Sequence, residues 1–167
     1  EFIKNYLKKD DMLIVSIGGN DVALSPSSET INKLKQLKRY GEDISKVPQD
    51  IKQHFYNIFG DQTKNYIEMI FKNQKTQATI ISMIYYPDEN YQDSWASKIL
   101  DRFSYKSKPK FLQNFIDDCY QNATKKIVIT GTKVISLELK KSLNGKATVD
   151  YKDAVEPSIS GGKKLAK

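Results

Sequence analysis

Short apolar segments alternate with amphipathic ones along this chain, and that alternation constrains its fold more than any other feature. The runs Met12–Ile17 and Ala78–Tyr86 have the length and the continuous apolar character of strands buried on both faces. Between and after them, apolar residues recur three and four positions apart, as on one face of a helix. This pattern predicts an α/β fold of three α/β/α layers with a mostly parallel sheet.

Capping residues and helix breakers predict where the helices begin and end. Ser28 is expected to cap a first helix, Pro48 to open a second that Gly60 ends, and Pro109 to open a later one. Further helices are predicted over residues 62–73, over residues 94–103 and from Ser158 onward, and further strands over residues 126–129 and 133–137. No repeat, linker or low-complexity tract divides the chain, so residues 1–167 are expected to form one domain.

Composition excludes several classes of function. The net charge is +7, but the lysines are scattered and arginine is scarce, so a nucleic-acid partner is not expected. No apolar run is long enough to span a bilayer. The single cysteine, Cys119, rules out an internal disulfide and favours a reducing, intracellular and cytoplasmic compartment. No metal-ligand spacing, phosphate-binding loop or dinucleotide fingerprint is present, so no metal or cofactor is expected.

The segment Gly18-Gly19-Asn20-Asp21 follows the first predicted strand and is the strongest candidate for chemistry. Paired glycines let a backbone turn sharply and approach a ligand closely. The Asn20 side chain then offers an amide donor beyond the strand, which suits an oxyanion, and Asp21 is placed to hold it. The alternative is an ordinary turn at the end of a strand, for which these residues are also typical.

A second segment, Asp153-Ala154-Val155-Glu156-Pro157-Ser158, places two carboxylates just before the last predicted helix. Taken alone, it is explained by helix capping and by a solvated loop.

Together, the two segments resemble the SGNH/GDSL hydrolase superfamily of esterases and lipases. Gly18, Asn20 and Asp21 match the family's Gly-x-Asn-Asp block, in which the asparagine is the oxyanion-hole donor. Asp153 falls at the aspartate of the family's Asp-x-x-His block, and the residues that follow match its continuation: Pro157, Ser158 and Gly161. The resemblance implies a flavodoxin-like three-layer fold and a small acyl-ester substrate. It also implies catalytic roles for Asn20, Asp153 and Glu156 and binding roles for Gly18, Gly19, Asp21 and Tyr86.

The sequence departs from this family in two ways. The Gly-Asp-Ser-Leu-like block that carries the nucleophile is absent from residues 1–17, so the first strand of the fold is expected to be missing and the domain incomplete. Unless that strand comes from elsewhere, for example from a protein partner, an open sheet edge is expected. Glu156 stands at the histidine position, and a carboxylate is a weaker base than imidazole at neutral pH unless it is desolvated.

Other candidate residues have simpler interpretations. Tyr86 ends a strand at the expected site, where it either lines a substrate pocket or packs in the core. His54, the only histidine, is expected to face solvent because its neighbour Phe55 faces the core. Ser16 is expected to pack within a strand, Ser158 to cap a helix, and Cys119 to be an inert core thiol.

Two functions follow from these residues. The first is an SGNH-type ester hydrolase whose serine lies upstream of this chain. The second is a catalytically inactive hydrolase fold that serves binding or scaffolding, which is favoured by Glu156 and by the absent serine motif.

Overall fold

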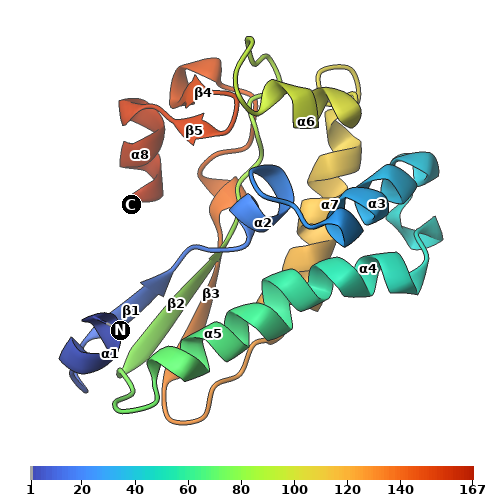
Figure 1. The fold of residues 1–167 in the computed structure, drawn as a ribbon. Helices are drawn as coiled ribbons and strands as arrows, with labels where there is room; N and C mark the ends of the chain where they lie inside the picture. The colour runs from blue at the N-terminus through green and yellow to red at the C-terminus, as the bar shows by residue number, and fades with distance from the viewer. Residues whose placement is uncertain (1) are drawn as a thin grey trace.

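A three-stranded parallel sheet forms the centre of the computed structural model, which describes residues 2–167 (Figure 1). Its strands are β1 (Met12–Val15), β2 (Ala78–Met83) and β3 (Lys133–Glu138), in that order across the sheet. Val15 is paired with Ile81, and Ile81 with Ser136. The expected α/β class and parallel sheet are confirmed.

The remaining elements are helices, a short strand pair and single 3-10 turns. The helices are α1 (Phe2–Tyr6), α2 (Gly19–Ala23), α3 (Ser28–Leu37), α4 (Gln49–Tyr56), α5 (Thr63–Ile70), α6 (Ser97–Arg102), α7 (Pro109–Asn122) and α8 (Ile159–Leu165). A short antiparallel pair, β4 (Tyr151–Asp153) and β5 (Glu156–Pro157), precedes α8. Single 3-10 turns lie at Lys38–Tyr40, Ile44–Lys46, Thr124–Lys126, Leu139–Lys141 and Thr148–Asp150. Within residues 2–167, no helix is long and apolar enough to cross a membrane.

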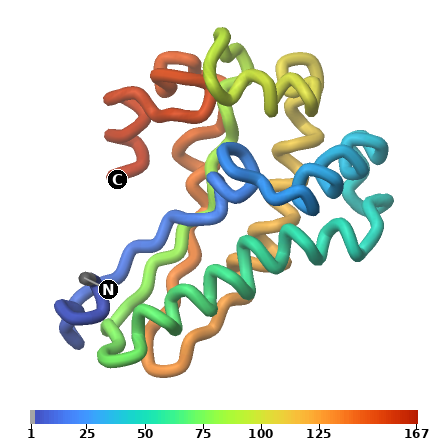
Figure 2. The backbone as a smooth tube through the Cα atoms, viewed as in Figure 1, coloured from blue at the N-terminus to red at the C-terminus, as the bar shows by residue number. Residues whose placement is uncertain are grey.

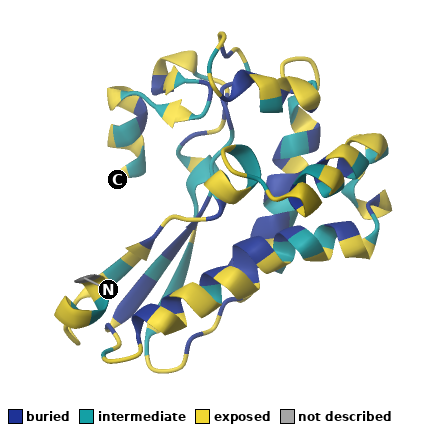
Figure 3. Ribbon diagram, in the orientation of Figure 1, coloured by how far each residue is buried: buried dark blue, intermediate teal, exposed yellow. Residues whose placement is uncertain are grey.

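The two faces of β1 differ sharply in burial. On one face, Val15 is buried with Ile67 and Ile70 of α5. In the neighbouring strand β2, Met83 belongs to the core cluster that includes Phe115 of α7. On the other face, Met12 and Ile14 are 61% and 69% exposed (Figure 3). β1 is also an outer strand, because within residues 2–167 it pairs with β2 and with no other strand. This outer edge and face of β1 are therefore open to solvent.

One long helix replaces two of the predicted ones. α4 continues through a π-helical segment, Asn57–Gln62, directly into α5, and Figure 2 shows the three as one rod. Gly60 lies inside this rod, so the prediction that it ends a helix was wrong. A Cβ at Gly60 would lie 3.2 Å from the Cβ of Ala123, so glycine permits close packing here.

Local signals placed other boundaries correctly. Pro109 is at the first turn of α7, and the Ser158 hydroxyl accepts the backbone N–H of Gly161 as the cap of α8.

Two other predictions were wrong. The cap of α3 is Ser27 rather than Ser28. The strand predicted over residues 126–129 is absent, and the chain there is irregular, with Ile127 and Ile129 buried against the sheet cluster.

The C-terminal helix packs closely on the turn that precedes β4. A Cβ at Gly161 would lie 2.0 Å from the carbonyl oxygen of Asp150, whereas a Cβ at Gly162 would meet nothing within 4 Å. The two glycines are adjacent in one helix but have opposite packing requirements.

We therefore expect Gly161→Ala to lower the free energy of unfolding by about 3 kcal/mol, because the backbone must move apart to admit a methyl group. Gly162→Ala is the matched control and should stabilise the protein by roughly 0.5–1 kcal/mol, since alanine favours the helix. Urea denaturation of both variants measures the difference. Equal effects of the two substitutions would contradict the close contact between α8 and Asp150.

Candidate functional site

The turn after β1 depends on a glycine that no other residue can replace without strain. Gly18 has φ of +95°, in the left-handed region, and a Cβ there would lie 2.8 Å from the ring of Phe59. Phe59 comes from the π-helical segment, so the long helix sets the direction in which the chain leaves the sheet. The next residue, Gly19, begins α2, and a Cβ there would lie 3.3 Å from the Ile84 side chain.

Asn20 is presented to solvent on the first turn of α2. Its backbone carbonyl accepts hydrogen bonds from Leu24 and Ser25. Its side-chain amide is exposed and makes no hydrogen bond with any residue between 2 and 167. The amide is therefore free to donate to a ligand. Asp21 is also exposed and is not hydrogen-bonded to Asn20, so it does not hold that side chain.

The acidic pair lies on the β4–β5 hairpin. The Asp153 carboxylate accepts the backbone N–H of Ala154 at 2.5 Å. The exposed Glu156 carboxylate accepts the indole N–H of Trp95 at 3.1 Å. Nearby, burial raises the pKa of Tyr85 to about 12, and the negative charge of Glu156 adds to that effect. Glu156 is thus a solvated carboxylate that has an aromatic partner.

Both segments lie at the same end of the sheet, beyond the carboxyl ends of β1 and β3 (Figure 1). That is the end at which open parallel sheets bind their ligands. In the described chain, however, no hydrogen bond or ion pair connects Asn20 to Asp153 or Glu156.

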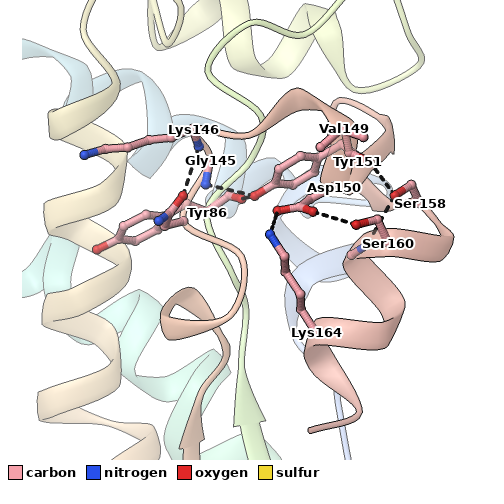
Figure 4. Close-up of polar contacts among 11 residues, drawn as sticks. Tyr86, Gly145, Lys146, Val149, Asp150, Tyr151, Ser158, Ser160 and Lys164 are labelled. Atoms are coloured by element: carbon pink, nitrogen blue, oxygen red, sulfur yellow. Dashed lines mark hydrogen bonds and ion pairs between the residues drawn. The ribbon is translucent and has the colours of Figure 1, made fainter.

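Tyr86 links the core to the C-terminal elements β4, β5 and α8. Its hydroxyl donates to Asp117 at 2.7 Å, and its ring lies 5.7 Å from the ammonium of Lys140. Its backbone carbonyl accepts the hydroxyl of Tyr151 at 2.7 Å, and the same hydroxyl accepts the backbone N–H of Gly145 (Figure 4). Burial and the adjacent Asp117 raise the pKa of Tyr86. These bonds give Tyr86 a structural role at this end of the sheet.

A polar pocket of about 670 Å³ lies beside the Asn20 loop, between α2, α3 and the long helix. Its walls include Asp21, the polar residues of α3, His54 of α4 and the exposed side of the π-helical segment. The complete lining is Asp21, Ser25, Ser27, Glu29, Thr30, Lys33, Asp50, Gln53, His54, Asn57, Ile58, Asp61 and Gln62.

His54 is held in this pocket, and the prediction that it faces solvent was wrong. Its side chain is 13% exposed. Nε2 is hydrogen-bonded to the hydroxyl of Thr30 at 2.9 Å, and Nδ1 lies 3.4 Å from the Glu29 carboxylate. The Thr30 hydroxyl also contacts Ser27, the cap of α3, at 2.9 Å. The sequence shows the helical face of His54 but not that α3 packs against it.

Two further residues were assessed from the sequence. Ser16 lies one residue past β1 and is exposed, so the expectation that it packs within the strand was wrong. Cys119 is fully buried, which confirms that it is a core residue, and burial raises the pKa of its thiol, as is typical of unreactive cysteines. Among residues 2–167, no group of three or more His, Cys, Asp or Glu side chains is arranged to hold a metal ion.

Comparisons with protein-family models, with curated proteins and with solved structures found no match to this chain.

An ion pair between the buried Asp150 and the half-exposed Lys164 of α8 should respond to pH. Asp150 accepts hydrogen bonds from Lys164 and Ser160 (Figure 4), and the bond from Lys164 is the main cause that lowers the pKa of Asp150 below 3.8. A carboxyl whose pKa is lowered by folding contributes stability above its unfolded pKa and loses it as the pH falls through the folded value.

We therefore expect Asp150→Asn to destabilise the protein at pH 7, and its difference from wild type to shrink as the pH falls below 3.8. Urea denaturation between pH 2 and pH 7 measures this. Asp93→Asn, at an exposed residue that forms no hydrogen bond or ion pair within residues 2–167, should behave as wild type throughout. A destabilisation by Asp150→Asn that is constant over this range would rule out the ion pair as its cause.

Proposed function

We propose that this chain is an SGNH-type ester hydrolase domain in which Asn20 stabilises the oxyanion. The observation that carries the proposal is the free amide of Asn20, held at the carboxyl end of β1 by a turn that only glycine allows. The acidic pair Asp153 and Glu156 at the same end of the sheet supports it.

In this reaction a serine hydroxyl would attack the ester carbonyl, and the carbonyl oxygen would gain negative charge. The Asn20 amide would donate a hydrogen bond to that oxygen. A hydrogen-bond donor aimed at this oxygen stabilises the charge that develops on it in the transition state. Asp153 and Glu156 would serve as the acid and base, as the family resemblance implies. The base would take the proton of the serine hydroxyl and give it to the alcohol as the ester C–O bond breaks.

The serine would be brought by a further strand alongside β1. The support for this is the open outer edge of β1, whose backbone groups can pair with another strand. Such a strand would also place apolar side chains beside Met12 and Ile14, which are exposed in this structure. The strand would come from the same polypeptide or from a partner.

One observation favours a second function, a catalytically inactive fold used for binding. Glu156 is exposed and accepts the Trp95 indole N–H. An exposed carboxylate stays hydrated, so it lacks the desolvation that would make it an effective base.

For the hydrolase, we expect Asn20→Ala to reduce the turnover of short acyl esters by the full-length protein by roughly 100- to 1000-fold, as removal of one oxyanion donor typically does. The substitution should leave stability nearly unchanged, since the Asn20 amide makes no bond in the described chain. Asn32→Ala, at an exposed position of α3, is the control and should keep full activity. Undiminished hydrolysis by Asn20→Ala would reject the proposed role.

A second variant separates the two functions. Glu156→His places an imidazole where the family has its base, so ester hydrolysis by the full-length protein should increase if the rest of the site is competent. Trp95→Phe, which keeps an aromatic ring but lacks the indole N–H bonded to Glu156, is the control for loss of that bond. Absence of activity in wild type and in Glu156→His from pH 5 to pH 9 would favour the binding function.

A further inference from the structure

An apolar groove of about 380 Å³ lies between α3 and α6, on the side of α3 opposite the polar pocket. Its floor is formed by Ile31 and Leu34 of α3, by Ile99 of α6, by Phe103 and by Pro26. Leu34 and Phe103 are at least nine-tenths buried, so the floor belongs to the core. A volume of several hundred Å³ with a mostly apolar lining is typical of small-molecule sites.

The polar groups that line this groove are all cations. They are Lys35, Lys38 and Arg102, and no acidic side chain lines the groove. In the described part of the chain, none of the three forms an ion pair or a side-chain hydrogen bond. Some lysines outside the groove have carboxylate partners, for example Lys33 with Asp50 at 2.6 Å and Lys140 with Asp117 at 2.6 Å. Three neighbouring cations without a counter-charge favour an anion at this position.

We propose that this groove binds a single-chain anionic amphiphile, such as a medium-chain fatty acid. The alkyl chain would occupy the floor, where it displaces water from Ile31, Ile99 and Phe103. The carboxylate would lie among the cations, and the guanidinium of Arg102 can bind a carboxylate through two parallel hydrogen bonds.

Charge and size together select this ligand class. A neutral apolar molecule would leave the three cations without a counter-charge. A nucleic acid would use the cations but not the apolar floor. A protein helix would need a larger interface than the eight residues that line this groove provide. The inference does not depend on the proposed esterase, because none of the groove residues belongs to the Asn20 loop or to the acidic pair.

The test is calorimetric titration of the full-length protein with decanoate below its micelle concentration, with decanol as the neutral probe of equal chain length. Saturable binding of one decanoate per chain is expected, at least about tenfold tighter than binding of decanol, because each charge-assisted contact adds to the apolar contribution. No saturable binding of decanoate, or equal affinity for the two probes, would overturn the proposal.

Two triple variants locate the site. Replacement of Lys35, Lys38 and Arg102 by Gln should weaken decanoate binding about tenfold or more and leave decanol binding unchanged. The control replaces three exposed lysines outside the groove, Lys9, Lys72 and Lys152, by Gln, which makes the same change in net charge. The control should bind as wild type, and equal weakening by both triples would assign the effect to net charge and overturn the groove.

A third variant tests the floor. Ile99 is half-buried at the groove, and Ile99→Trp should fill the groove and abolish binding of both probes. Circular dichroism checks that the variant is folded, and the triple variants carry the test if it is not. A folded Ile99→Trp protein that binds decanoate as wild type would show that the ligand lies elsewhere.

Discussion

The contact between Phe59 and the turn after β1 connects the long helix to the Asn20 loop at the carboxyl end of the sheet. The Phe59 ring occupies the space where a side chain at position 18 would lie. Its backbone carbonyl accepts the hydroxyl of the buried Thr124, just beyond α7. One residue later, Gly60 packs against Ala123. Two adjacent residues of the long helix therefore hold both the Asn20 loop and the end of α7.

The π-helical segment makes this double contact possible. Segments of this kind are rare and shift the direction of the side chains that follow. Here Ile58, Phe59 and Gly60 are buried, while Asn57, Asp61 and Gln62 line the polar pocket. The irregularity in the helix thus coincides with the wall of the pocket and with the support of the loop that presents Asn20.

α3 separates two regions of opposite character. Thr30 and Lys33 line the polar pocket, which is rich in carboxylates and contains His54. Ile31, Leu34 and Lys38 line the apolar groove, which has only cationic polar residues. Because the pocket and the groove use different faces of one helix, each can be altered by surface substitutions that leave the other intact. The lysines are scattered along the sequence, but in the structure carboxylates line the pocket on one side of α3 and cations line the groove on the other.

The sequence by itself determined the features that depend on neighbours along the chain. The apolar runs predicted β1, β2 and β3, Pro109 and Ser158 marked helix starts, and the glycine pair placed a turn and an exposed Asn20 after β1. Only the tertiary structure decided what depends on distant partners. Gly60 lies inside a helix because Ala123 packs on it, and His54 is covered because Thr30 faces it. Ile127 and Ile129 are buried although residues 126–129 pair with no strand, which apolar composition alone cannot reveal. Each of these outcomes depends on packing between segments far apart in the sequence, and a local pattern contains no information about such contacts.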